Sequence, residues 1–152
     1  MTRKTAFVLG YILLAVASCL AANNDIVGVW YNQAKDAKID IAQCGEKYCG
    51  KIVWLKEPSY PPGSKDGTPG TPKLDHNNPD PSLKKTPVMG LEIVRDFQFS
   101  GDNLWKDGKI YDPKSGKTYS AKITLVSPTQ LNLRGFVGVS LFGRTETWTK
   151  TQ

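Results

Sequence analysis

The stretch AKIDIAQCGEKYCGKIVWLK (residues 37–56) predicts two antiparallel strands joined by a short turn. Residues 37–42 alternate apolar and polar side chains, which is the period of a half-buried strand, and residues 49–56 form a second apolar segment. Cys44 and Cys49 flank the glycine-containing turn and can face each other across it, so we expect a disulfide there. Such a bond would persist in an oxidising compartment.

Six further segments with strand character lie outside this pair. They are residues 26–31, 89–99, 104–111, 117–126, 129–137 and 141–150, and a turn is expected at Asp107-Gly108 inside the third of them. No segment has a helical period, and turn residues recur at the short spacing of a β-sandwich or a β-barrel. At 152 residues the chain has the length of one domain.

Residues 57–87 interrupt this pattern with a long loop that holds eight of the ten prolines. Proline removes backbone donors, so a strand is not expected there. Loops of this length are uncommon inside compact domains and are often functional. The segment lies within the domain, as a lid, a recognition surface or a crossover.

The first residues have the layout of a secretory signal peptide, so we assign residues 1–22 to it and 23–152 to the domain. A basic start precedes an apolar run, residues 6–17, that is too short for a spanning helix of ~20 residues. Cleavage near Ala21 or Ala22 predicts a periplasmic or secreted protein. Alternatively, residues 16–19 resemble a lipobox, in which Cys19 would carry a lipid anchor and the protein would be an outer-membrane lipoprotein.

The charge pattern gives little sign of a nucleic-acid partner. The formal net charge is +6, but the lysines are interleaved with acidic residues along the chain. A metal site is also not expected, because tetrahedral zinc needs about four ligands and His76 is the single histidine. We expect no cofactor.

Nine motifs in fixed order resemble a bacterial family catalogued as domain of unknown function 2147. The resemblance implies exported envelope proteins of Gram-negative bacteria with a small, antiparallel, up-and-down, lipocalin-like β-barrel of about eight strands. It brings no catalytic residue with it. The motifs are GVW (28–30), IAQCG (41–45), YCGKIVWL (48–55), DHNNPD (75–80), PVMGL (87–91), WKDGKIYDP (105–113), GKTY (116–119), LRGF (133–136) and GRTETW (143–148).

Lipocalins carry a Gly-x-Trp on the first strand and an arginine on a late strand that packs across the tryptophan. This resemblance implies that Trp30, in Gly28-Val29-Trp30, plugs one end of the barrel with Arg144 stacked on its indole. The long loop would then lie at the opposite, open end. We expect any interior ligand to bind there, with Trp54 and the loop as its gate.

The candidate ligand-binding residues are aromatic or cationic strand positions. Trp54, Trp105 and Tyr111 fill the core or touch a ligand. Arg95 and Arg134 interrupt apolar strands, so they face solvent or mark a paired polar point inside the barrel.

No catalytic set emerges from the sequence. His76 has no partners in a catalytic frame, and Asp107 and Asp112 fall at turns, where aspartate is favoured for local hydrogen bonding. The favoured hypothesis is a binding module for a small amphipathic or lipid-like molecule, or for an envelope protein. The alternatives are an envelope hydrolase or isomerase that uses barrel-mouth carboxylates, and a structural or stress-related interaction module.

Overall fold

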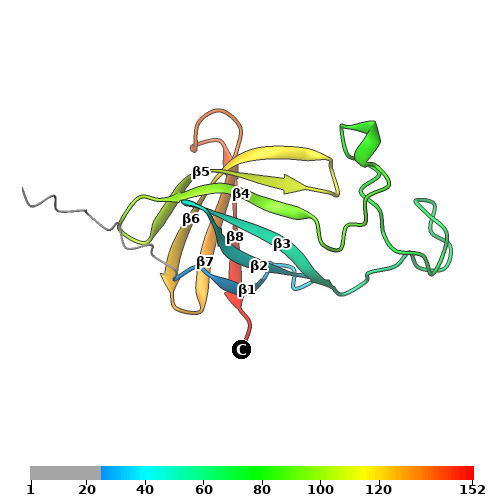
Figure 1. Cartoon of the computed structure of the whole chain (residues 1–152), viewed down its shortest axis with the longest axis horizontal. Coiled ribbons are helices and arrows are strands. Elements are labelled where there is room, and N and C mark those ends of the chain that lie inside the picture. The colour runs from blue at the N-terminus through cyan, green and yellow to red at the C-terminus, as the bar shows by residue number, and fades with distance from the viewer. Residues whose placement is uncertain (1–24) are drawn as a thin grey trace, which may run out of the picture.

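The computed structural model describes residues 25–152, and its eight antiparallel strands close into one barrel (Figure 1). Each strand pairs with its neighbours in the chain, and the last pairs with the first. The predicted up-and-down barrel of about eight strands is therefore confirmed. The strands are β1 (Gly28–Tyr31), β2 (Ala37–Cys44), β3 (Lys47–Leu55), β4 (Glu92–Phe99), β5 (Leu104–Asp112), β6 (Lys117–Ser127), β7 (Gln130–Phe136) and β8 (Gly143–Lys150).

The alternating strand directions give the barrel two different ends. The N-terminal end is where β1 begins, and it carries residues 25–27, the turns at 45–46, 100–103 and 128–129, and the end of β8. The loop end carries the turn at 32–36, the long loop 56–91, the turn at 113–116 and the β7–β8 loop at 137–142. Within the long loop, a 3-10 helix spans Pro81–Leu83.

Side chains fill the middle of the barrel. Fully buried apolar side chains occupy inward positions of several strands, as the period-two pattern predicts, and they include Trp30, Ile39, Phe97, Trp105 and Ile123. An eight-stranded barrel is just wide enough for such a filling. Glycine is required at position 108, because a Cβ there would collide with the ring of Phe97.

The Cys44–Cys49 disulfide is present, but the hairpin that carries it is tighter than predicted. The turn is Gly45-Glu46, and Cys44 pairs with Lys47 while Ala42 pairs with Cys49. The two cysteine Cα atoms lie 5.9 Å apart, which is within bridging range. Both strands thus continue into the segment that the sequence assigned to the turn.

The turn predicted at Asp107-Gly108 is wrong. β5 runs without interruption from Leu104 to Asp112, and the register against β6 shifts between Trp105 and Gly108. Asp107 has a φ of 60°, so the residues that resemble a turn form a bulge inside one strand.

The seam between β1 and β8 is the shortest in the barrel. Two residue pairs hold it, Trp30 with Lys150 and Tyr31 with Thr149. Beyond them the Gln33 side chain accepts a hydrogen bond from the Thr147 backbone at 3.0 Å.

Within residues 25–152, no helix is long and apolar enough to span a bilayer.

Candidate functional site

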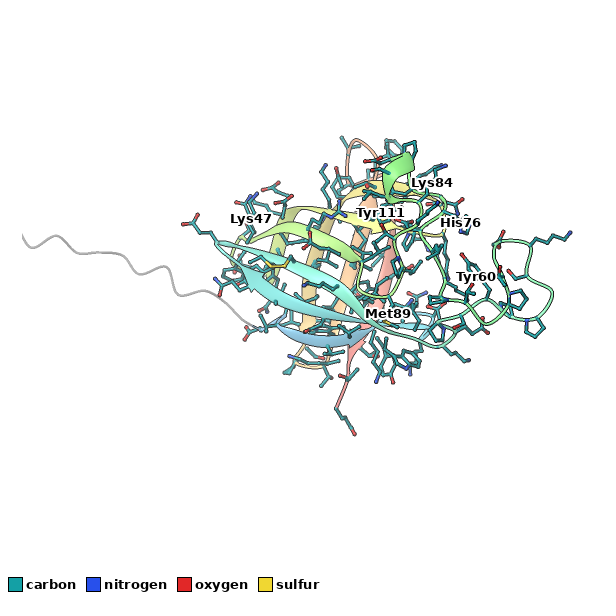
Figure 2. All side chains as sticks on the ribbon, turned by 45° about the vertical axis from the view of Figure 1, so that its right-hand side comes forward. Lys47, Tyr60, His76, Lys84, Met89 and Tyr111 are labelled. Atoms are coloured by element: carbon teal, nitrogen blue, oxygen red, sulfur yellow. A yellow bond between two sulfur atoms is a disulfide. The ribbon has the colours of Figure 1, made fainter. Side chains whose placement is uncertain are left out.

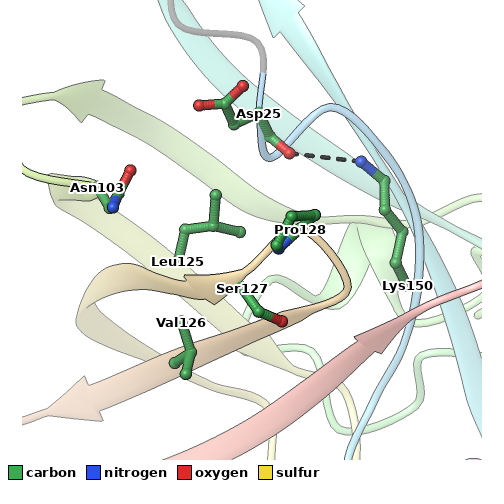
Figure 3. A pocket seen from close by; sticks show the side chains of 7 residues that line it. All are labelled: Asp25, Asn103, Leu125, Val126, Ser127, Pro128 and Lys150. Carbon is green, nitrogen blue, oxygen red and sulfur yellow. Dashed lines mark hydrogen bonds between the residues drawn. The ribbon is translucent and has the colours of Figure 1, made fainter.

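A hollow opens at the N-terminal end of the barrel, between the entering chain, two turns and the end of β8 (Figure 3). Its volume is about 570 Å³, within the ~300–1,000 Å³ range of ligand sites. It is a half-open depression and not an enclosed cavity. The lining residues are Asp25, Asn103, Leu125, Val126, Ser127, Pro128 and Lys150.

The lining of this hollow is divided between apolar and polar groups. β6 and the turn after it supply Leu125, Val126 and Pro128, and Lys150 closes the opposite side. Lys150 Nζ lies 3.4 Å from the Asp25 carbonyl oxygen, to which it donates, and 5.1 Å from the centroid of the Trp30 ring. The ammonium group is thus held at the edge of the hollow, where it can donate to a ligand.

Trp30 forms the floor beneath Lys150. Its indole is fully buried, and Nε1 donates to the Ile26 carbonyl at 2.8 Å. The prediction that Arg144 stacks on this ring is wrong, because the cation over it is Lys150. β8 pairs Arg144 with Gly135 near the loop end, whereas Lys150 pairs with Trp30 itself.

Trp54 stands on the outside of the barrel rather than over its interior. It pairs with Lys38, next to the Tyr31–Lys38 pair of β1 and β2. Its ring meets Tyr31 edge-on at 6.0 Å, and Lys38 Nζ lies 5.4 Å from its centroid. The position is near the loop end, as expected, but the side chain is 36% exposed beside its outward neighbours.

Arg95 and Arg134 also face outward, which resolves the two alternatives for them. Arg95 makes an ion pair with Glu92 at 3.5 Å and donates to the Glu92 carbonyl. Arg134 Nε donates to the Ser140 carbonyl at 2.7 Å, so it braces the β7–β8 loop. Neither guanidinium marks a polar point inside the barrel.

Trp105 and Tyr111 are both buried, in different surroundings. Trp105 belongs to the core and meets Tyr48 edge-on, and its indole N–H has no hydrogen-bond partner among residues 25–152. The Tyr111 hydroxyl donates to Asp75 at 2.7 Å.

None of the five predicted ligand-binding residues lines the hollow at the N-terminal end.

Asp75 fastens the long loop to the barrel. Its carboxylate is fully buried and accepts hydrogen bonds from Tyr111 and, at 2.7 Å, from the Asn78 amide. Burial and the neighbouring Asp75 carboxylate raise the pKa of Tyr111 well above its usual range. Figure 2 shows Tyr111 beside the part of the loop that carries His76.

The next residues of the loop dock on the β5–β6 turn. The Asn77 amide donates to the Lys114 carbonyl at 2.9 Å, and a Cβ at Gly116 would collide with the Asn77 carbonyl. Gly116 also has a φ of 69°, which favours glycine. The loop therefore lies fixed along this end, and the buried Asp75 carboxylate is its anchor.

The carboxylates proposed for catalysis do not form a pair. Asp112 accepts hydrogen bonds from the Lys114 backbone at 3.0 Å and from the Ser115 hydroxyl at 2.7 Å, so it holds its own turn. Asp107 lies in the β5 bulge and lines a shallow hollow on the outer face. No cluster of three potential metal ligands occurs in the part of the chain that the structure describes.

Comparisons with known proteins agree with this architecture. A solved structure described as protein HP1028 of the human pathogen Helicobacter pylori, a member of the lipocalin family, superposes with a TM-score of 0.68. It is 21% identical to this chain, and the alignment covers 83% of this chain and 82% of that protein. This likeness shows the lipocalin-like fold. A search of curated proteins found no match.

A family model matches the whole barrel, from Gly28 to Lys150. The match begins at the first residue of β1 and ends at the last residue of β8, so it spans all eight strands and the long loop of this chain. The chain therefore belongs to the family described as "Uncharacterized protein conserved in bacteria (DUF2147)".

Proposed function

We propose that the protein binds a small amphipathic molecule in the hollow at the N-terminal end of the barrel. The observation that carries this proposal is the division of the lining between apolar residues of β6 and the Lys150 ammonium. The lipocalin-like fold supports small-molecule binding in general. This location replaces the loop-end site expected from the sequence, because Trp54 faces outward and the interior is filled.

In this arrangement the ligand's apolar part rests on Leu125 and Pro128, which lie on the side of β6 that faces Asp25 in Figure 3. Its head group accepts hydrogen bonds from Lys150, which the Asp25 carbonyl and the Trp30 ring hold in place. Because Trp30 closes the barrel beneath the hollow, the ligand lies across the barrel end and does not enter the core.

A titration with decanoate measures the binding, and decyltrimethylammonium serves as a probe of opposite head-group charge. We expect decanoate to bind more tightly. Lys150→Gln should weaken its binding about 10–100-fold, because a hydrogen bond to a charged group contributes about 1.5–3 kcal/mol. Calorimetry gives both affinities directly.

The matched control is Lys51→Gln, an exposed lysine on β3 away from the hollow, which should leave the affinity unchanged. Circular dichroism of both variants checks that the barrel is intact. If neither probe binds the wild-type protein, or if the two lysine variants weaken binding equally, this site is refuted.

We also propose that the protein is exported to the bacterial envelope. The proposal rests on residues 1–22, and the Cys19 lipid anchor is its alternative form; both lie outside the described residues. We expect the intact mass of the envelope protein to begin at residues 21–24 or at an acylated Cys19. An envelope form that retains Met1 contradicts both versions.

A further inference from the structure

The loop between β7 and β8 exposes four large apolar side chains on one short tip. The tip, residues 137–142, extends past the strands at the top of Figure 1. Val137, Val139, Leu141 and Phe142 are exposed by 70%, 58%, 78% and 71%. Single exposed apolar residues are ordinary on protein surfaces, but a contiguous group points to a binding surface.

The tip is held in shape from the adjoining strands. Arg134 donates from Nε to the Ser140 carbonyl at 2.7 Å and from Nη2 to the Leu141 carbonyl at 3.1 Å. Its Nη1 donates to the Thr145 hydroxyl at 2.9 Å. This bracing fixes the backbone of the tip before any partner arrives, which lowers the entropy lost on docking.

Positive charge lies on the outer face near the end of β7, the strand that leads into the tip. A shallow hollow of about 320 Å³ on the outer face is lined by Phe136, the last residue of β7, and by Lys106, Lys109 and Lys122. Asp107 is the single acidic residue of that lining. The apolar tip therefore continues into a predominantly basic surface.

We propose that this tip docks the barrel on an anionic bilayer, with its apolar side chains in the interface and the lysines against the lipid head groups. Apolar side chains bordered by cations are the combination that binds anionic membrane surfaces. A second copy of the chain fits this face less well, because symmetric contact would bring the same lysines of both copies together. The docking is independent of the hollow at the N-terminal end.

Vesicle co-sedimentation tests the docking, with vesicles of phosphatidylcholine alone or mixed in equal parts with phosphatidylglycerol. The protein used begins at residue 23, because the apolar run 6–17 can itself enter lipid. Every strand pair that closes the barrel lies within residues 28–150, so this shorter chain retains the whole fold. Circular dichroism verifies that fold.

We expect the wild-type chain to bind the mixed vesicles and to bind phosphatidylcholine vesicles at least about tenfold less. The double variant Leu141→Ser, Phe142→Ser should lose about tenfold or more in affinity for the mixed vesicles. Lys109→Glu with Lys122→Glu should do the same, and about 1 M salt should release the wild-type protein by screening. The matched control, Val53→Ser, removes an exposed valine on β3 and should bind like wild type.

Three results would overturn the proposal. They are no binding of the wild-type chain to mixed vesicles, binding that the tip variant leaves unchanged, and equal binding to both vesicle types. Sedimentation velocity without lipid adds a fourth, since a wild-type dimer that the tip substitutions dissociate would assign the tip to a second copy. Failure here leaves decanoate binding at the other end of the barrel unaffected.

Discussion

Trp30→Ala is expected to lower the free energy of unfolding by about 3–5 kcal/mol. The indole is fully buried at the point where β1 meets both β2 and β8, opposite Ile39 and Lys150. Its removal leaves a cavity under the shortest seam of the barrel and also removes the hydrogen bond to the Ile26 carbonyl. Urea denaturation followed by circular dichroism measures the change.

Trp54→Ala is the matched control for this substitution. Trp54→Ala should lower the free energy of unfolding less than Trp30→Ala, because Trp54 is 36% exposed and its ring packs edge-on against Tyr31. An aromatic pair of this kind contributes about 0.5–1.5 kcal/mol beyond its buried area. If both alanine variants cost the same, Trp30 does not have the plug role assigned to it.

Tyr111→Phe is expected to destabilise the fold by about 1–3 kcal/mol, because it leaves an oxygen of the buried Asp75 carboxylate without its donor. The loss should be concentrated in the long loop, since the Tyr111–Asp75 bond joins β5 to that segment. Amide exchange at Asp75 and Asn78 should therefore accelerate more than exchange in β6 and β7.

The raised pKa of Tyr111 also predicts how stability depends on pH. The folded state holds the phenolic proton more tightly than the unfolded chain, in which tyrosine has a pKa of about 10. The stabilisation that Tyr111 gains from its raised pKa is complete below about pH 10 and is lost as the pH rises above that value. In Tyr111→Phe, this part of the alkaline loss should disappear.

Tyr31→Phe provides the comparison, because Tyr31 lies on the outer face, where its ring packs on Trp54. Removing its hydroxyl should change stability little and should leave amide exchange in the long loop unchanged, because the Tyr111–Asp75 hydrogen bond is retained. A Tyr111→Phe variant that behaves like Tyr31→Phe in both measurements would show that the Tyr111–Asp75 hydrogen bond does not fasten the long loop to the barrel.

The eight strands were predictable from sequence because apolar and polar side chains alternate over much of their length, most regularly in β2. Ile39 and Ile41 of β2 are buried, with Asp40 exposed between them. Asp107-Gly108 misled the prediction because a β-bulge uses the same residue types and the same positive φ as a turn. Local sequence cannot separate the two, since the difference lies in the pairing with β6.

The cation over Trp30 shows a similar limit. Both Arg144 and Lys150 lie on β8, and the register of the seam decides which of them reaches the indole. That register rests on two residue pairs between segments more than a hundred positions apart in the chain. The Trp30 of the motif Gly28-Val29-Trp30 is buried, but no pattern on β8 identifies the cation that lies over its ring.

The hollow at the N-terminal end also could not be predicted from the sequence. Its lining comes from the entering chain, from Asn103 in one turn, from Leu125–Pro128 and from Lys150. No two of these segments are adjacent in the sequence, so no motif joins them. Residues chosen for being aromatic or cationic, such as Trp54 and Arg134, instead have structural contacts on the outer face.

The most direct test of the account is a residue-resolved titration of the ¹⁵N-labelled protein with decanoate, followed by amide chemical shifts. We predict the largest shifts at Asn103, at Leu125–Ser127 and at Lys150, with Leu55, Ile110 and Tyr119 near the loop end unchanged. Shifts concentrated at the loop end, or no saturable shift anywhere in the barrel, would contradict the binding site proposed at the N-terminal end.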